Sequence, residues 1–442
     1  MTILRWAWTS GALALVVSAC GPTVGDPANS GGDGEGSTAD GSASSDDHTG
    51  GGPGAGGPSC GDGVIDPGES CDERGATPSC NEYCRVPGSL LQETTGPGCG
   101  GKDVRGDANG DVVVHGYGCI TGTNALSVQL TRLDARGEVL WTQAWTDPET
   151  SYASGQALAL DAAGNAFVVG TARGGNITSS EPGYAWTRKH AADGTLLWMD
   201  VHVRSAGLAT DAFDVATDGG GHALVAGATA DVAWLRKLDA DGELVWELER
   251  DLENGLAHTT HVASNEAGTI ALAMNRQPAD LGWVTGVTAY AGDGAAVWDA
   301  TLDHLVGGRD LPSALAMASD GTLAVLGEFE SPTSHRNTVF VHTLTGDGAT
   351  AWSWEHDTPA DDCGVAIDGG GSVFALWADT GDDGERLVLA RFAPDGALAW
   401  RSTIAGPGDI GLTCGVGLDA DQNPVVAATP SPSQTWVAWF AR

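Results

Sequence analysis

Hydrophobic and polar positions alternate in short runs over most of the chain, and glycine-containing turns separate the runs. In a representative unit the runs cover 212–217, 222–227, 232–238 and 243–249. Alternation, β-branched side chains and Asp-Gly turns favour strands over helices. We therefore predict that residues 86–442 form short antiparallel strands without a long helix.

Two motifs recur in this region about every fifty residues, which is the period of a repeat architecture. One is an Asp-x-x-Gly type of turn between two apolar runs, and it occurs seven times. The other is a glycine followed four positions later by tryptophan. Its six copies end at Trp141, Trp198, Trp246, Trp298, Trp352 and Trp400. Each unit therefore carries four short strands, as a β-propeller blade does, and seven turns predict seven blades.

The two ends of the repeat region are complementary. The chain finishes with a run at 435–442 that matches a third strand, so the last unit lacks its fourth strand. Near the start of the region, Gly88 and Gln92 align with the Gly-to-Trp motif, with Gln92 in the tryptophan position. We predict that this N-terminal segment supplies the missing outer strand and closes the ring, which removes an exposed sheet edge.

The Gly-to-Trp motif has a structural interpretation. Glycine supplies the left-handed backbone conformation that a tight hairpin turn requires. The position before each tryptophan is apolar as well, so we expect both faces of the fourth strand to be buried between neighbouring sheets. We therefore interpret the tryptophans as core residues rather than as a cofactor site. The apolar positions before them are Leu140, Leu197, Val245, Val297, Ala351 and Ala399.

The first residues of the chain predict export. A signal peptide is expected at 1–19, because Arg5 precedes an apolar stretch that is too short to span a bilayer. The end of this stretch, Val-Ser-Ala followed by Cys20, resembles the lipobox of bacterial lipoproteins. The resemblance implies that Cys20 is lipid-modified and anchors the protein to a membrane. Gly21 after the cysteine favours the outer membrane, with the protein facing the periplasm or the cell surface.

Two segments separate the anchor from the repeats. Residues 20–59 are rich in Gly, Ser and Asp, with almost nothing apolar to bury, and we predict a lipidated, disordered linker. Residues 60–85 contain Cys-Gly-Asp-Gly at Cys60 and Gly-Glu-Ser-Cys-Asp at Cys71, a pattern that resembles the small Cys-rich repeat of exported myxobacterial proteins. A module of about 26 residues cannot build a hydrophobic core, so we expect two disulfides, with three pairings open.

Outside the anchor position, the even number of cysteines indicates disulfides in an exported chain. Cys363 and Cys414 occupy the same place in the first strands of neighbouring units, and we predict that they pair. Cys99 and Cys119 flank the first two strands of the propeller and are the remaining pair. The full set of candidates is Cys60, Cys71, Cys80, Cys84, Cys99, Cys119, Cys363 and Cys414.

Few residues in the sequence are candidates for catalysis, for cofactor binding or for metal binding. His258 and His261 have a spacing that suits a metal, but their strand context favours structural histidines, and we predict no catalytic residue and no cofactor. A calcium ion in the Cys-rich module is the one exception, because clustered carboxylates suit a hard cation. The alternative is a solvated acidic loop. The acids concerned are Asp62, Asp66, Glu69, Asp72 and Glu73.

The repeat itself supports a resemblance. The run at 212–246 carries the Asp-x-x-Gly turn and ends in Lys-x-Asp-x-x-Gly-x-x-x-Trp, and it resembles the exported bacterial β-propeller repeat family. The resemblance extends over most of the chain and implies an all-β, seven-bladed propeller. It implies no particular activity, because propellers support many functions. The family has no agreed catalytic residues that could be transferred.

The net charge and the lengths of the loops restrict the kinds of partner and the binding surface that we expect. With 58 acidic and 21 basic residues the net charge is −37, which argues against nucleic acid as a partner. Second-to-third and interblade connections are long and variable and emerge on one face, where recognition residues usually lie. The candidate binding residues on this face are Asp147, Glu149, Asp251, Glu253, Asp303, Asp310, Asp357, Asp382, Asp383 and Glu385.

We therefore expect a non-catalytic binding or adhesion module of the cell envelope. Its partner would be a cationic or polyhydroxylated surface, either a protein or a polysaccharide, because the face is acidic. The protein is expected to be a monomer held at the membrane by its lipid. Two alternatives remain open: a scaffold component of an outer-membrane complex, and an extracytoplasmic enzyme that acts at the loop face.

Overall fold

The computed structural model describes residues 69–72, 77, 80–81, 84–96, 98, 100–118, 127–146, 152–173, 183–204, 208–230, 232–253, 260–278, 281–304, 309–330, 337–356, 358–381, 384–404, 410–430 and 434–442. The predicted signal peptide and linker lie outside these residues, as do Cys20, Cys60, Cys99 and Cys119. None of the described residues is helical. No helix among them is long and apolar enough to cross a membrane.

The described strands form seven four-stranded antiparallel sheets, which we number as blades. Blade 1 contains β2 (Gly100–Gly106), β3 (Val112–Gly118), β4 (Ser127–Leu133) and β5 (Val139–Trp145). Blade 2 contains β6 (Tyr152–Leu160), β7 (Ala166–Arg173), β8 (Tyr184–His190) and β9 (Leu196–His202). Blade 3 contains β10 (Thr210–Thr217), β11 (Ala223–Thr229), β12 (Val232–Leu238) and β13 (Leu244–Asp251).

The remaining blades follow the same order from the centre outward. Blade 4 contains β14 (Thr260–Ser264), β15 (Ile270–Arg276), β16 (Val284–Tyr290) and β17 (Ala296–Leu302). Blade 5 contains β18 (Arg309–Met317), β19 (Leu323–Glu330), β20 (Asn337–Leu344) and β21 (Thr350–Glu355). Blade 6 contains β22 (Ala360–Ile367), β23 (Val373–Gly381), β24 (Gly384–Phe392) and β25 (Leu398–Ile404). Blade 7 contains β26 (Ile410–Leu418), β27 (Pro424–Pro430), β28 (Thr435–Phe440) and β1 (Leu90–Gly96).

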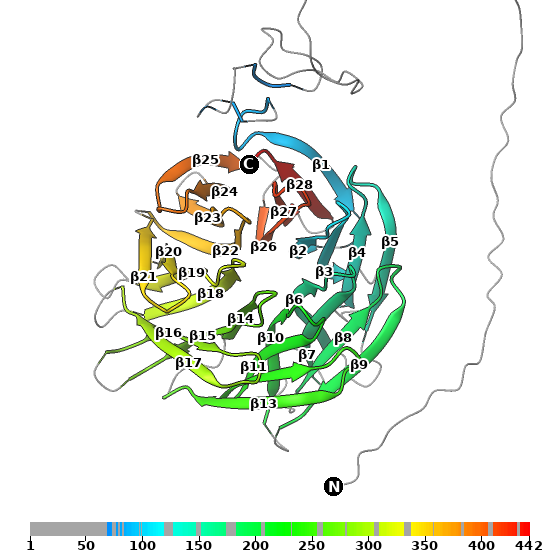
Figure 1. Ribbon diagram of the computed structural model, residues 1–442. Helices are drawn as coiled ribbons and strands as arrows, with labels where there is room; N and C mark the ends of the chain where they lie inside the picture. The colour runs from blue at the N-terminus through cyan, green and yellow to red at the C-terminus, as the bar shows by residue number, and fades with distance from the viewer. Residues whose placement is uncertain are drawn as a thin grey trace, which may run out of the picture. The chain divides into compact units, whose positions relative to one another are not determined.

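The blades form a seven-bladed propeller whose first strands surround a central channel (Figure 1). Seven hydrophobic clusters each join two neighbouring sheets, so the core lies between blades rather than at the centre. Between blades 2 and 3, for example, Phe167 packs in one cluster with Val225 and Trp234. Apolar burial of this kind is the main stabilising force of the ring.

Closure by the N-terminal segment is confirmed. β1 pairs antiparallel with β28, from Leu90 opposite Phe440 to Gly96 opposite Thr435. Gln92 lies opposite Trp439, and the ladder shifts register between Leu90 and Gln92. The other outer strands shift register at the same distance before their tryptophans, for example beside Trp198 in β9. β1 is therefore a true fourth strand, contributed from the opposite end of the chain.

The Gly-to-Trp motif holds consecutive blades together. Gly194 has a φ of +87°, and a Cβ added there would lie 3.0 Å from the ring of Trp141 in the preceding blade. Glycine is thus required both by the turn and by the indole beneath it. In the first five blades the indole nitrogen also donates to a carbonyl oxygen in that turn. The donors are Trp141, Trp198, Trp246, Trp298 and Trp352, and the acceptors are Ala192, Ala240, Gly292, Gly346 and Pro394.

The prediction that both faces of the fourth strand are buried was wrong. Leu140, Leu197 and Val297, which precede their tryptophans, are 52%, 51% and 62% exposed. The motif tryptophans themselves are half-buried and pack at the edges of the clusters. Adjacent sheets diverge from the centre of a ring to its rim, so only the face of the outer strand that carries tryptophan meets the next blade.

Two of the expected disulfides are present. Cys71 bonds to Cys80, which selects one of the open pairings, and Cys84 is disulfide-bonded as well. Cys363 in β22 bonds to Cys414 in β26, as predicted from their matching places in neighbouring blades. The Cys-rich module also contacts the end of the propeller, because Asn81 Nδ2 donates to the carbonyl oxygen of Arg442 at 3.3 Å.

Candidate functional site at the loop face and channel

The propeller has two dissimilar faces. The turn face carries the connections between first and second strands and between third and fourth strands. The loop face carries the second-to-third and interblade connections. On the turn face the same backbone pattern repeats, as in Gly194 N to Ala191 O at 2.9 Å and Gly242 N to Asp239 O at 3.0 Å. Most connections of the loop face contain residues outside the described part of the chain.

The predicted acidic residues differ in their positions. Asp251 is exposed at the end of β13, Glu253 is exposed just after this strand, and Asp303 is exposed after β17. Glu253 has a φ of 50°, a backbone conformation that an L residue rarely adopts and that is frequent at functional positions. Glu385 lies in β24. The candidates outside the described residues are Asp147, Glu149, Asp357, Asp382 and Asp383.

Asp310 does not belong to an exposed binding face. Its side chain is fully buried, and its Oδ2 accepts a hydrogen bond from the backbone nitrogen of His304 at 2.8 Å. Its carbonyl oxygen accepts a hydrogen bond from Asn275 Nδ2 at 2.8 Å. Asp310 therefore fixes the connection between blades 4 and 5, and the prediction of a surface role for it was wrong.

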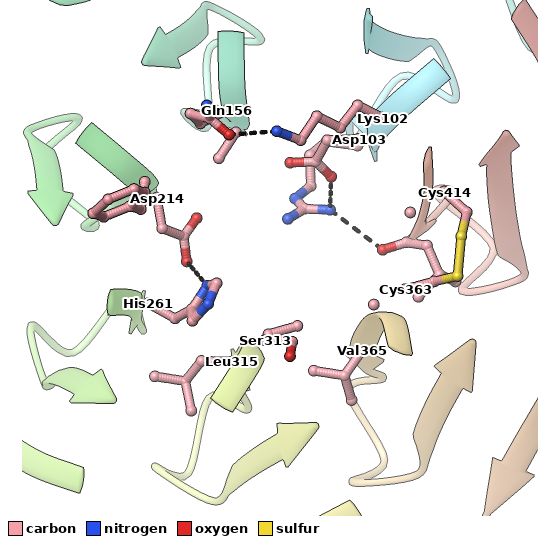
Figure 2. A pocket seen from close by; sticks show the side chains of 17 residues that line it. Lys102, Asp103, Gln156, Asp214, His261, Ser313, Leu315, Cys363, Val365 and Cys414 are labelled. Carbon is pink, nitrogen blue, oxygen red and sulfur yellow. Dashed lines mark hydrogen bonds and ion pairs between the residues drawn. A yellow bond between two sulfur atoms is a disulfide. The ribbon is translucent and has the colours of Figure 1, made fainter. Parts of the chain in front are cut away.

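A cavity of about 210 Å³ occupies the channel near the loop face. Figure 2 shows its wall, in which Lys102 points toward Gln156, His261 points toward Asp214, and the Cys363–Cys414 disulfide crosses one side. A second space of about 300 Å³, lined mainly by apolar side chains such as Leu160 and Met317, continues toward the turn face. Lys102, Asp103 and His261 line the first space and not the second, so more titratable side chains face the channel near the loop face.

β-bulges create this wall. In five blades, one residue of the first strand has no partner in the second strand, and we call it the skipped residue. The bulge at this residue changes the direction in which its side chain points. In each of the five strands the skipped residue lines the cavity: Lys102, Gln156, Phe213, Ser313 and Cys363. Sequence reasoning missed these residues, because a bulge depends on the pairing partner and leaves no local motif.

Asp103 and Asp214 lie directly after two of these bulges and link neighbouring blades. Asp103 accepts hydrogen bonds from the backbone nitrogens of Val104 at 2.8 Å and of Leu158 in the next blade at 2.9 Å. Asp214 accepts hydrogen bonds from the backbone nitrogens of Val215 at 2.8 Å and of Val262 in the next blade at 3.0 Å. Each carboxylate therefore ties its own first strand to the next one.

A basic side chain lies beside each of the two carboxylates. Arg105 Nη1 lies 2.6 Å from Asp103 Oδ1. Burial raises the pKa of Asp103, and the charge of Arg105 and the hydrogen bonds from the amides oppose this effect. His261 Nδ1 lies 3.5 Å from Asp214 Oδ2. The two acids are therefore part of the support of the channel wall rather than open ligands.

A third acidic group lies between blades 5 and 6. Ser313 donates its hydroxyl hydrogen to Asp362. Burial raises the pKa of Asp362 to about 6, although the hydrogen bond from Ser313 and the charge of His261 lower it. Burial, together with the charges of Asp362 and Asp361, raises the pKa of Glu328 to about 7. Ser313–Asp362 and His261–Asp214 are two separate pairs and do not form a nucleophile–base–acid relay.

The residues proposed for calcium are only partly described. Glu69, Asp72 and Cys84 place one ligand atom each within 4.8 Å of one another. The sulfur of Cys84 is in a disulfide and is not a thiolate, so two carboxylates are left as hard-cation ligands. Asp62, Asp66 and Glu73 lie outside the described residues.

Several solved structures are similar to this chain, each at low sequence identity. A protein of unknown function from Bacteroides caccae is 13% identical, with a TM-score of 0.39, and the match covers 66% of this chain and 93% of that one. The β-propeller domain of the Trilobed protease from Pyrococcus furiosus is 11% identical, with a TM-score of 0.46 and coverage of 79% and 94%. The acylaminoacyl peptidase of Pyrococcus horikoshii is 12% identical, with a TM-score of 0.44 and coverage of 77% and 51%. No protein-family model and no curated protein matches the chain.

Proposed function

We propose that this protein is a non-catalytic binding or adhesion module of the cell envelope that recognises its partner through the loop face. The protein would be exported, lipid-anchored at Cys20 to the outer membrane, and monomeric. The observation that carries the proposal is the contrast between the faces. The turn face repeats one backbone turn in every blade, whereas the connections of the loop face differ in length and expose Asp251, Glu253 and Asp303.

A basic or polyhydroxylated envelope component suits such a face. Exposed carboxylates attract cations over about 8 Å at physiological salt and accept hydrogen bonds from hydroxyl groups. The rigid ring would hold the loops in fixed positions, which lowers the entropy lost when a partner binds. The acids after the bulges, Asp103 and Asp214, are engaged in the wall and would add little to recognition.

Charge neutralisation tests the proposal. The triple variant Asp251→Asn, Glu253→Gln, Asp303→Asn should weaken binding to outer-membrane vesicles and to a lysine decapeptide about tenfold, at about 0.5 kcal/mol for each exposed pair. The matched control is Glu138→Gln, Glu266→Gln, Asp421→Asn, which removes the same charge from exposed positions of the turn face. Equal loss in both triple variants, or no loss in either, would contradict the proposal. A Cys20→Ala variant that stays in the membrane fraction would contradict the anchor.

A scaffold role in an outer-membrane complex is the second candidate, and one surface favours it. The outward face of β9 is apolar along its length, since Leu197, Met199, Val201 and the following Val203 are all 40–56% exposed. An exposed apolar edge strand is a template for another strand. The double variant Met199→Asp, Val201→Thr should release the protein from a native membrane complex, as seen by size-exclusion chromatography. Unchanged elution would remove this candidate.

A further inference from the structure

The chain contains three lysines, and two of them have a clear structural role. Lys189 Nζ lies 3.4 Å from Asp161 Oδ2, and Lys237 Nζ lies 2.8 Å from Asp218 Oδ2. In both blades a cation on the third strand meets the acid of the turn between the first and second strands. These two ammonium groups are therefore neutralised within the fold.

Lys102 is held in a different way. Its Nζ donates to two neutral acceptors in the next blade, Gln156 Oε1 and the carbonyl oxygen of Gly155. Within the described part of the chain, no carboxylate forms an ion pair with it. It is the skipped residue of the bulge in β2, and its side chain reaches along the cavity wall toward Gln156 (Figure 2). The fold thus presents, in a cavity near the loop face, a fixed amine that no described carboxylate pairs with directly.

The surroundings raise the fraction of this amine that is neutral. Burial lowers the pKa of Lys102 to about 8, although the charge of Asp103 raises it. At pH 7 roughly one in ten Lys102 side chains is neutral, against about one in three thousand for a lysine of ordinary pKa. His115, in β3 beside this site, is neutral at pH 7, because burial and the charge of Lys102 lower its pKa to about 3.

The other titratable groups that face this part of the channel lie against one another in pairs. Arg105 lies against Asp103 on the same strand, and His261 lies against Asp214 across the cavity. Apolar side chains complete the wall, including Phe213 and Leu315. A small, largely apolar molecule with one reactive group would therefore fit the space beside Lys102.

We propose that Lys102 captures small carbonyl compounds, most readily aromatic or branched aldehydes, by forming an imine inside the channel. The nitrogen lone pair of the neutral amine bonds to the carbonyl carbon, the carbon–oxygen π bond breaks, and one nitrogen proton moves to the oxygen. The resulting carbinolamine loses its hydroxyl group together with the second nitrogen proton as one water molecule, which leaves a carbon–nitrogen double bond. The capture uses the channel and does not depend on recognition by the acidic loops.

Reductive trapping on the folded full chain tests this proposal. The protein is incubated with benzaldehyde and sodium cyanoborohydride between pH 6 and pH 9, and the benzyl mark on each lysine is quantified by peptide mass spectrometry. We expect Lys102 to be marked at least about tenfold faster than Lys189 or Lys237 at pH 7, in keeping with its larger neutral fraction. The preference should disappear in denaturant, where the three lysines become equivalent.

Two variants separate reactivity from a structural role. Lys102→Arg keeps the positive charge and should abolish the preferential mark. Gln156→Glu places a carboxylate beside Nζ, favours the charged form, and should move the midpoint of the pH profile upward while Lys189 and Lys237 stay unchanged. Equal marking of the three lysines in the folded chain, or a folded chain in which Lys102 is not marked, would overturn the proposal.

Discussion

Replacing Gln92 with tryptophan should strengthen the junction at which the ring closes. Blades 1 to 5 each place a tryptophan under the turn of the next blade, with its indole nitrogen donating to that turn. At the junction of blades 7 and 1 the same contact is made by an amide, since Gln92 Nε2 donates to the carbonyl oxygen of Ala135 at 2.9 Å. The hydrogen bond is kept, but the aromatic surface is missing.

The structure shows space for that surface. A cavity of about 360 Å³ at this junction is lined by Leu91, Gln92, Ala135 and Trp439. A half-buried tryptophan removes roughly 100 Å² from water, worth about 2.5 kcal/mol at 25 cal/mol per Å². The methylene groups of Gln92 already supply part of this burial. We therefore expect Gln92→Trp to raise the free energy of unfolding by about 1–1.5 kcal/mol.

Urea unfolding followed by circular dichroism measures the change. Gln92→Phe is the matched control, because it adds aromatic surface without an N–H donor and should gain about 1 kcal/mol less than Gln92→Trp. Gln92→Ala should be less stable than the parent protein. A Gln92→Trp variant that is less stable than the parent would show that Trp439, which lies opposite Gln92, leaves no room, and would refute the reasoning.

Three further predictions concern other contacts. Removing the Cys363–Cys414 disulfide by double substitution with serine should lower the free energy of unfolding by about 4 kcal/mol, the entropic value for a separation of 51 residues, as measured by urea unfolding. Glu328→Gln should be more stable than the parent protein by about 2 kcal/mol above pH 7 and no more stable at pH 4.5, in melts at a series of pH values. Trp198→Phe should cost about 1–2 kcal/mol, because the hydrogen bond to Ala240 at 2.8 Å is lost.

The sign of the Glu328 prediction follows from its pKa, which rises from 4.5 to about 7 on folding. The folded state binds the proton more tightly, so stability falls as pH rises through this interval, and glutamine removes the loss. A Glu328→Gln variant with the same pH profile as the parent protein would contradict this reasoning.

The control for Trp198→Phe is Trp400→Phe. The buried indole nitrogen of Trp400 has no hydrogen-bond partner among the described residues, so its loss should cost less. Equal costs would contradict the role of the hydrogen bond.

The features that could be predicted from the sequence are those with a local or repeated signal. Gly88 and Gln92 revealed the closing strand because their spacing matches six other copies of one motif. Cys363 and Cys414 could be paired because they occupy equivalent places in consecutive units. Both inferences required only that every unit fold in the same way.

The features that were missed depend on relations between blades. In the sequence, nothing distinguishes Lys102 from another lysine in a strand. Only the pairing of β2 with β3 shows that it has no partner in the ladder. Asp103 becomes part of the wall only because the backbone nitrogen of Leu158, in the next blade, donates a hydrogen bond to its Oδ2 at 2.9 Å. The exposure of Leu197 follows from the divergence of sheets toward the rim, which alternation along one strand does not report. The burial of Asp310 depends on its contacts with His304 and Asn275 of the preceding blade.

The closing strand also determines how the ring responds to mechanical force. Tension on the chain ahead of β1 reaches the propeller at Leu90, which lies opposite Phe440 near the end of the chain. When force is applied at this end, the residue pairs of the antiparallel ladder would separate one after another. Strands resist this kind of separation less than they resist sliding along each other. Backbone hydrogen bonds of Gly88 and Ser89 with Ala441 lie ahead of the ladder and must break first. Tension from the N-terminal side would therefore open the propeller within blade 7, between β28 and β1, while the other six blades stay intact.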